Sequence, residues 1–421
     1  MAEQSNTPQL RFQGYTDAWG QESFASVFDF LSNNTLSRAE LTEEGGEVKD
    51  VHYGDVLIKF GEVLDPSKES IPFVSSLEKK SIPSKDFLKD GDVIIADTAE
   101  DATVGKCTEI VNSNGYSLVS GLHTFPIRPR KAFGKGYLGF YMNSNSYHNQ
   151  LVPYMQGIKV TSLSRSAMLN TTIAYPKDIS EQEKIGGAFF QIDSLLSLHQ
   201  RKLDKLQAIK KSLLQKMFPA EGEDRPQIRF AGYTDAWGQE RVSDLLVERN
   251  TQSPKSNEYP LMAFIAEKGV APKGERYDRS ALVKDEDGKL YKQTELGDFI
   301  YSSNNLETGS IGLNKYGKAT ISPVYSIFYP TGLTDSDFIG RLMIRKQFIN
   351  KMLSTRQGVV YGQWKIHESD FLAISVAVPS LEEQRKIGGL LDKVDSLLSL
   401  HQRKLYKLQE IKKALLQKMF C

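Results

Sequence analysis

The chain has 421 residues with 40% hydrophobic and 25% charged side chains, the composition of an ordinary folded protein with room for about two to four domains. Its polar first residues are not those of a signal peptide, and no apolar run reaches the roughly 18 residues of a membrane helix. Two cysteines, Cys107 and Cys421, exclude a disulfide framework and a cysteine-based metal cluster. We therefore expect a cytoplasmic protein that does not span a membrane.

The net charge of +1 hides an uneven distribution of charge along the chain. Residues 1–105 carry nine Lys/Arg against twenty Asp/Glu, whereas residues 106–177 carry eight Lys/Arg against one acid, Glu109. Residues 338–367 again hold six basic residues and no acid. A polyanion responds to the local field rather than to the average charge. Either stretch alone would fit a solvated basic face equally well, but the same bias in both halves favours nucleic-acid binding.

The first element in chain order belongs to a repeat. Residues 9–22 read QLRFQGYTDAWGQE and residues 227–240 read QIRFAGYTDAWGQE, identical at 12 of 14 positions. A second pair, residues 181–218 and 383–420, is identical at 29 of 38 positions with an offset of 202. The stretches between these repeats are mostly unlike each other. A chain that duplicates its framework and varies what lies between is expected to hold two different modules in equivalent positions.

Both variable stretches are predicted to be mixed α/β modules, because short apolar runs bounded by Gly, Asp and Pro alternate with longer segments. In the first module we expect strands at 56–60, 92–97 and 122–128, a helix around 136–150, and a last strand at 173–176. In the second we expect strands at 299–303 and 320–330, a helix around 335–354, and a last strand at 376–379. Local matches between the two predict that the modules are diverged copies of one fold.

Each module leads into a long helix with apolar residues in a 4–3 pattern, which keeps one seam facing a partner helix as in a coiled coil. The sequence around Ser180 resembles a capping box, and Ser380 takes the same place in the second copy. The seam residues, expected at a helix–helix or partner interface, are Ile185, Ile192, Leu196, Leu203, Leu206 and Leu213 in the first helix and Ile387, Val394, Leu398, Leu405, Leu408 and Leu415 in the second.

The repeat is circular. A polar breaker with two prolines, residues 219–226, joins the first helix to the second copy of the RF-x-GYTDAWGQE segment, and the first copy of that segment stands near the start of the chain. We therefore predict an α+β fold with pseudo-twofold symmetry, in which two long antiparallel helices join two mixed α/β domains. The predicted boundaries are 1–22, 23–179, 180–226, 227–240, 241–379 and 380–421.

Motifs of catalysis are absent from the sequence. Residues 134–139, GKGYLG, fit the dinucleotide fingerprint, but no acid follows at residues 150–164 to bind a ribose. There is no phosphate-binding GxxxxGK[ST] motif, and the six histidines lack metal-ligand spacing. We therefore expect no catalytic residue, no metal site and no cofactor in this chain, and we read these glycines as turn residues.

The candidate DNA-binding residues come from the basic stretches of both modules. Lys and Arg neutralise phosphates, while Arg and Gln also read base edges. The candidates are Lys106, Arg128, Arg130, Lys131, Lys135, Lys159 and Arg165 in the first module, and Arg341, Arg345, Lys346, Lys351, Arg356, Gln357 and Lys365 in the second.

The duplicated PQ-[LI]-RF-x-GYTDAWGQE, the joint P-x₄-EQ-x-KIGG and the helix DSLLSLHQRKL-x-KLQ-x-IKK-x-LLQKMF resemble the DNA-specificity subunits of type I restriction-modification systems over the whole chain. The resemblance implies a non-catalytic subunit whose two target-recognition domains read the halves of an asymmetric, split DNA sequence. It implies that the helices set the unread spacer and dock two adenine-N6 methyltransferase subunits and two translocase–nuclease restriction subunits. S-adenosylmethionine, ATP and Mg²⁺ would belong to those partners.

Two other functions remain open at this point. A coiled-coil scaffold with two protein-binding modules predicts no salt-dependent affinity for DNA. An enzyme with an unrecognised site in the modules predicts catalysis by the purified chain alone. A methyltransferase gene beside this one would favour the specificity subunit over both.

Overall fold

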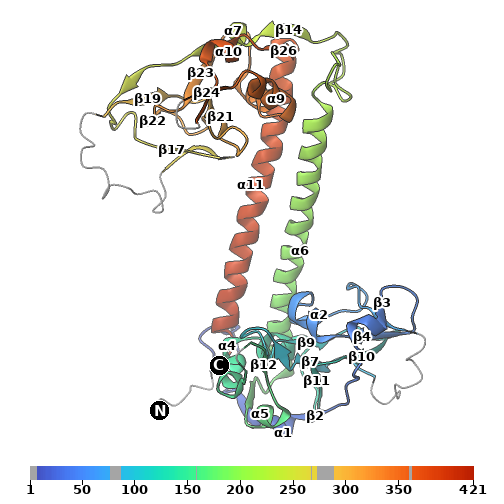
Figure 1. The fold of residues 1–421 in the computed structure, drawn as a ribbon. Coiled ribbons are helices and arrows are strands. Elements are labelled where there is room, and N and C mark those ends of the chain that lie inside the picture. Colours follow the sequence, from blue (N-terminus) through green and yellow to red (C-terminus); the bar gives the residue numbers. More distant parts are fainter. Residues whose placement is uncertain (1–6, 76–86, 158, 267, 273–288, 360–362) are drawn as a thin grey trace. The chain divides into compact units, whose positions relative to one another are not determined.

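The computed structural model describes residues 7–75, 87–157, 159–266, 268–272, 289–359 and 363–421. The chain divides into two compact units, Met1–Gln200 with Arg403–Cys421 and Arg201–Gln402. Each unit contains one variable module, the beginning of one long helix and the end of the other (Figure 1). The predicted α+β class, with mixed α/β modules and two long helices, is confirmed.

The long helices are α6 (Ile179–Lys216) and α11 (Leu381–Lys418), each of 38 residues, or about 57 Å at 1.5 Å per residue. They begin within two residues of the predicted starts. In unit 1, Asp193 lies 2.8 Å from Lys412, and the rings of Phe189 and Phe420 lie 5.8 Å apart. Residue numbers fall along one helix as they rise along the other, so the helices run antiparallel, as predicted (Figure 1).

The first module is built on two sheets. The five-stranded sheet has the order β2 (Phe28–Phe30), β11 (Thr124–Pro129), β7 (Val93–Ala96), β9 (Cys107–Ile110), β5 (Val63–Leu64). The four-stranded sheet has the order β10 (Ser117–Ser120), β4 (Val48–Val51), β6 (Phe73–Val74), β3 (Leu41–Thr42). Two further pairs are β1 (Gly20–Ser23) with β13 (Thr172–Tyr175) and β12 (Thr161–Ser162) with β8 (Thr98–Ala99). Its helices are α1 (Phe24–Val27), α2 (Tyr53–Ile58), α3 (Tyr137–Met142), α4 (Asn145–Leu151) and α5 (Arg165–Leu169), with 3₁₀ turns at Arg38–Glu40 and Val152–Tyr154.

The second module repeats this plan with changes. Its four-stranded sheet has the order β15 (Leu246–Glu248), β23 (Ser326–Pro330), β20 (Phe299–Tyr301), β21 (Ile311–Leu313). Beside it lie β16 (Gln252–Ser253), β19 (Tyr291–Thr294) and β22 (Ala319–Ile321), with the pairs β17 (Ala263–Ile265)–β18 (Gly269–Ala271), β24 (Gln357–Val359)–β25 (Gln363–Lys365) and β14 (Gly238–Arg241)–β26 (Ser375–Val378). Its helices are α7 (Val242–Leu245), α8 (Ser336–Met343), α9 (Lys346–Ser354) and α10 (Glu368–Leu372).

The two modules share the same central connections. In each, the segment after the GYTDAWGQE repeat pairs with the last strand before a long helix (β1–β13 and β14–β26), and the next strand pairs with the strand before the paired helices (β2–β11 and β15–β23). These matches support the interpretation of the modules as diverged copies of one fold.

Three details of the prediction are wrong. Residues 56–60 are not a strand, because residues up to Ile58 belong to α2, which begins where the His52 ring accepts a hydrogen bond from the Gly54 amide. Ile58 is 89% exposed, so the apolar run does not mark a buried strand. Each predicted module helix is split in two, at 143–144 and at 344–345, and the single strand predicted at 320–330 is two strands, β22 and β23.

The hydrophobic core of each module is completed by the long helices. In unit 1 the core cluster includes Ile185 and Phe189 from the start of α6 and Phe420 from just beyond the end of α11. In unit 2 the corresponding residues are Ile387 from α11 and Phe218 after α6. Each helix is therefore fixed at both of its ends by burial in a module.

Candidate nucleic-acid interface and its helical frame

The repeated segment before each module is clamped to the start of a long helix by a buried ion pair. Arg11 donates from Nε and Nη2 to Glu181 at 2.6 and 2.8 Å, and Arg229 donates in the same way to Glu383 at 2.7 and 2.8 Å. Both carboxylate side chains are 1% exposed. Each arginine also donates to a backbone carbonyl, Arg11 to that of Asp17 and Arg229 to that of Asp235. A bidentate arginine fixes orientation as well as distance.

The same segment contacts the end of the other long helix. The amide of Leu10 donates to the Lys418 carbonyl at 2.8 Å, and that of Ile228 donates to the Lys216 carbonyl at 2.9 Å. Trp19 packs edge-on against Phe420 in unit 1, as the second tryptophan does against Phe218. The N-terminal segment thus continues α11 in space as residues 227–240 continue α6 in sequence, which supports the predicted circular repeat.

A buried glutamine beside each clamp holds the module. Gln182 accepts from the Gly134 amide at 2.8 Å and donates to the Pro176 carbonyl at 2.7 Å. Gln384 accepts from the Asp335 amide at 3.1 Å and donates to the Pro379 carbonyl at 2.9 Å. The repeated Glu-Gln dipeptide therefore fastens the repeat segment with its first residue and the module with its second.

The glycines of the module and helix allow close backbone contacts. A Cβ at Gly186 would lie 2.2 Å from the Lys135 carbonyl oxygen. Gly136, with a φ of +80°, precedes α3, and the buried Glu109 carboxylate accepts from the amides of Gly136 at 2.7 Å and Gly139 at 2.8 Å. Burial raises the pKa of Glu109 to about 7. The glycine-rich segment therefore forms a helix start, in agreement with its interpretation as a turn.

Several candidate cations of the first module are already bound to carboxylate or carbonyl groups of the protein itself. Arg128 forms a bidentate pair with the buried Asp92 at 2.8 and 2.7 Å. The Lys106 ammonium donates to the carbonyls of Leu57 and Phe60, and burial lowers its pKa. Such cations hold the module together, and their charge is largely compensated.

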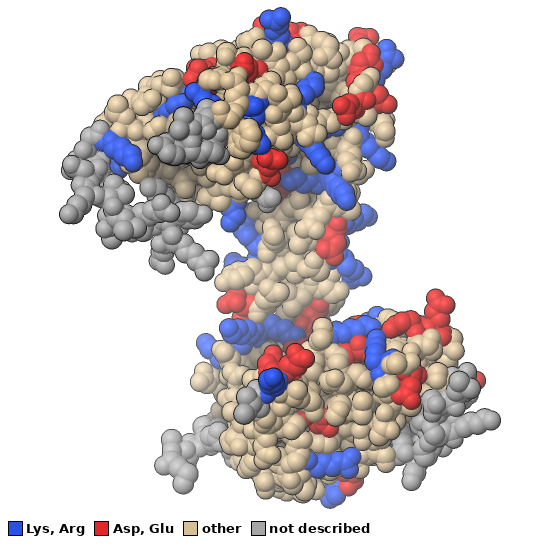
Figure 2. Space-filling model, in the orientation of Figure 1, with Lys and Arg blue, Asp and Glu red and all other residues tan. Residues whose placement is uncertain are grey.

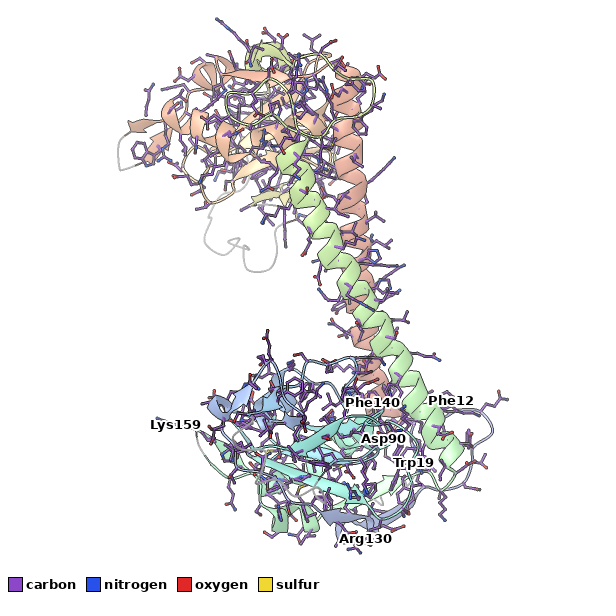
Figure 3. All side chains as sticks on the ribbon, turned by 90° about the vertical axis from the view of Figure 1, so that its right-hand side faces the viewer. Phe12, Trp19, Asp90, Arg130, Phe140 and Lys159 are labelled. Atoms are coloured by element: carbon purple, nitrogen blue, oxygen red, sulfur yellow. The ribbon has the colours of Figure 1, made fainter. Side chains whose placement is uncertain are left out.

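The other cations of this module lie at different edges. A hollow of about 480 Å³ is lined by Arg128, Arg130, Lys131 and Lys135, together with acidic residues including Asp90. Lys159 is exposed at another edge, away from Arg130 and Asp90 (Figure 3). Arg165 is exposed with its guanidinium 5.2 Å from the Phe30 ring centroid. The predicted residues thus do not form one continuous surface.

The second module shows the same division. Arg341 is 8% exposed and pairs with Asp392 and Asp395 of α11, and Arg356 pairs with Glu307 at 2.9 Å. Further contacts inside the unit are made by Arg345 to the Pro219 carbonyl, by Lys351 to the Ser375 carbonyl and by Gln357 to Asp370. Lys346 and Lys365 are exposed, and neither forms an ion pair within the described part of the chain. Basic side chains on the visible face lie among acidic ones rather than in a single basic field (Figure 2).

All twelve seam residues of the long helices are buried or partly buried. A second apolar set, outside the 4–3 pattern, remains exposed and is repeated. In unit 1 it comprises Leu195 (43% exposed), Leu198 (38%) and Ile411 (46%), and in unit 2 Leu397 (44%), Leu400 (38%) and Ile209 (39%). Sequence reasoning missed this set, although its signal is readable as apolar residues that stand off the seam at the same places in both copies.

Among the residues that the structure describes, no three His, Cys, Asp or Glu side chains stand together as metal ligands would. Within the same residues, no helix combines the length and the apolar character needed to cross a bilayer.

Comparison with known proteins gives a consistent result. Residues 263–410 match the type I restriction modification DNA specificity domain. A protein of Methanocaldococcus jannaschii assigned as the type I restriction enzyme MjaX specificity subunit is 20% identical over 380 residues, which are 84% of each chain. The crystallised type I restriction-modification S subunit from M. genitalium has a TM-score of 0.60 at 13% identity over 99% of both chains. The HsdS subunit from Thermoanaerobacter tengcongensis aligns over 97% of this chain and 98% of its own, with 16% identity and a TM-score of 0.45. The chain is thus similar to the specificity subunits of type I restriction-modification systems, over residues 263–410 in the domain match and over 84% of its length in the match to the Methanocaldococcus jannaschii protein.

Proposed function

We propose that this chain reads a bipartite, asymmetric DNA sequence for a type I restriction-modification complex and is itself non-catalytic. The observation that carries the proposal is that two unlike modules are held by two copies of one frame. Each copy of the frame consists of a repeated segment (residues 9–22 or 227–240) and a long helix (α6 or α11). The clamps Arg11–Glu181 and Arg229–Glu383 have the same geometry, whereas the modules they hold differ in sheet composition and in surface residues. Two binding sites joined in one molecule bind a two-part target as a single intramolecular event.

The unlike modules favour two unlike half-sites, with an unread spacer whose length the continuous helices α6 and α11 would set. Exposed cations such as Lys159, Lys346 and Lys365 are the first candidates for phosphate contacts, because their charge is not held by an ion pair among the described residues. We keep the occupied arginines as weaker candidates, since Arg128, Arg341 and Arg356 would each have to leave a carboxylate to reach DNA.

The exposed apolar set supports docking of partner subunits. Leu195 and Ile209 occupy one heptad position two heptads apart, and Leu397 and Ile411 occupy the same position in α11. In an antiparallel pair of helices, equal heptad positions face the same side of the pair. Each unit therefore carries one copy of the same apolar patch, formed by Leu195, Leu198 and Ile411 in unit 1 and by Leu397, Leu400 and Ile209 in unit 2. Exposed apolar side chains that recur in this way mark an interaction site. We assign one methyltransferase subunit to each patch, with the restriction subunits joining the resulting complex. S-adenosylmethionine, ATP and Mg²⁺ would then be bound by these partners.

The experiment that tests the proposal is co-expression with a methyltransferase subunit encoded beside this gene, followed by single-molecule sequencing of the host DNA. We expect methylated adenines within one motif made of two different half-sites and a fixed gap. A stable, active methyltransferase complex that leaves no such motif would refute the recognition function and favour a scaffold. Catalysis by the purified chain alone would instead favour the enzyme alternative.

Docking is tested by charge substitutions on the patch. Leu198→Glu alters the unit 1 patch only, so the complex should lose about one of two methyltransferase subunits when its mass is measured by light scattering. Leu198→Glu combined with Leu400→Glu should lose both. Gln207→Glu, exposed on the other flank of the seam, is the matched control and should leave the mass unchanged. Full assembly of the double variant would remove the patches from the proposal without touching DNA recognition.

A further inference from the structure

The two copies of the long helix differ in one block. Residues 188–192 read AFFQI, and the equivalent residues 390–394 read LLDKV. Within the repeat 181–218 and 383–420, the four remaining differences are single and scattered. Five consecutive changes in an otherwise repeated helix suggest that these residues contact something that also differs between the two units.

In unit 1 the block contacts the first module through aromatic rings. Phe190 packs edge-on against Phe140 of α3 with ring centroids 5.7 Å apart, and Phe189 stacks on Phe140 at 4.7 Å. The Phe190 ring also lies 2.7 Å from the place that a Cβ on Gly136 would take. The contact of Phe190 with Phe140 and Gly136 is apolar and closely packed, and the Lys412 ammonium, 5.5 Å from the Phe140 ring centroid, is already paired with Glu62 and Asp193.

In unit 2 the equivalent contact is ionic. Helix α8 corresponds to α3, because both follow the strand that pairs with β2 or β15, and YLGFYM in α3 aligns with FIGRLM in α8. Arg341 therefore takes the place of Phe140, and Asp392 takes the place of Phe190. Arg341 donates from Nη2 to Asp392 at 3.3 Å, and Lys315 pairs with the same carboxylate at 2.6 Å.

The two members of the contact have thus changed together. Phe140 faces Phe190 in one unit, and Arg341 faces Asp392 in the other. A mixed pair would place Arg341 against a phenylalanine. In the native chain Arg341 also contacts Asp395 at 2.9 Å, and in the mixed pair only the residue equivalent to Asp395, Asp193, would remain as a partner. The reverse mixture would place a half-exposed carboxylate beside Phe140, without the arginine that Asp392 faces in unit 2. The Arg341 side chain is 10% exposed and that of Asp392 is 45% exposed, so a mixed pair costs stability mainly at the buried guanidinium, whereas replacing both residues leaves no buried arginine to be paired.

We propose that residues 188–192 and 390–394 are matching blocks, each of which fits a long helix to its own module. The exchangeable recognition unit therefore runs past the last strand of the module and ends inside the helix, at Ile192 or Val394. This inference does not depend on which bases the modules read. It predicts that a transplanted module keeps its stability only when its block moves with it.

The direct test is a pair of chimeras that place the second module in the first position. In one, residues 23–180 are replaced by residues 241–382, and in the other AFFQI is also replaced by LLDKV. We expect the first chimera to melt about 3–5 °C below the second, and the amides of the transplanted α8 to exchange about tenfold faster. Equal melting temperatures and equal exchange would overturn the proposal.

A mutant cycle in the native chain covers the case in which neither chimera folds. Asp392→Phe and Arg341→Phe should each lower the melting temperature of unit 2, whereas the double variant should recover more than half of the larger loss. Lys393→Gln is the control, because Lys393 is exposed in the same block and glutamine is the residue of the other copy. Additive losses in the double variant would show that the two positions are not matched.

Discussion

Replacing Arg11 by methionine tests whether the repeated clamp holds the frame together. The arginine side chain is 14% exposed and Glu181 is 1% exposed, so solvent compensates little of the lost charge. Two charge-assisted hydrogen bonds of 2.6 and 2.8 Å would be removed and a buried carboxylate left unpaired. Breaking a buried pair in this way costs about 3–5 kcal/mol. For a unit of this size, that corresponds to a loss of about 10 °C in melting temperature.

The assay is urea unfolding combined with hydrogen exchange of the N-terminal segment. Residues 7–19 are held to α11 by the Leu10–Lys418 hydrogen bond and by Trp19, so their amides should exchange roughly 100-fold faster in Arg11→Met. Arg11→Met with Glu181→Met should regain most of the stability, because no charge is then left buried. A single variant that loses less than about 1 kcal/mol, or a double variant no better than the single, would refute this account of the clamp.

Three further predictions address the joint, the pH dependence and the circular repeat. Gly186→Ala should destabilise unit 1 by forcing a Cβ against the Lys135 carbonyl, whereas Gly187→Ala meets no atom within 4 Å and should stabilise the helix by about 1 kcal/mol in thermal unfolding. Because the pKa of Glu109 is raised to about 7, its contribution to stability is present below pH ~4.5 and is lost as the pH rises through 7. The free energy of unfolding should therefore fall by about 3 kcal/mol over this range. Glu109→Gln should flatten the dependence of the unfolding free energy on pH. A circular permutant opened within 219–226, with the present ends joined, should fold with native circular dichroism, and one that only aggregates would contradict the circular arrangement.

The frame could be predicted from the sequence because its signals are long and redundant. A 4–3 pattern sustained over some 30 residues has few competing interpretations, and its duplication gave the antiparallel, circular arrangement. The module strands were predicted less well. Apolar runs of four or five residues, such as residues 56–60, fit a strand or an amphipathic turn equally, and here the cap at His52 and the exposure of Ile58 belong to a helix.

The candidate site was predictable only as a composition. A count of basic residues cannot show where their partners lie, because the carboxylates come from distant segments. Arg128 meets Asp92 across the sheet, and Arg341 meets Asp392 and Asp395 from a different element of the fold. The strongest basic signals therefore included side chains that hold the modules together. Exposure, which only the structure supplies, separates these from Lys159 and Lys365.

The contacts of the molecule fall into two classes, those that recur in both units and those that differ between them. The contacts of the clamp arginine, of the repeated tryptophan and of the buried glutamine use the same side chains in both units. Arg11, Trp19 and Gln182 recur at identical places in the second copy. Contacts between module and helix at residues 188–192 and 390–394 use different chemistry in each unit, aromatic at Phe140 and ionic at Arg341. The Arg11–Glu181 and Arg229–Glu383 clamps join repeated segments only, so a new module can be accepted without loss of these ion pairs. The cost of exchange is then confined to the few helix residues that face the module, where the two copies of the helix have diverged.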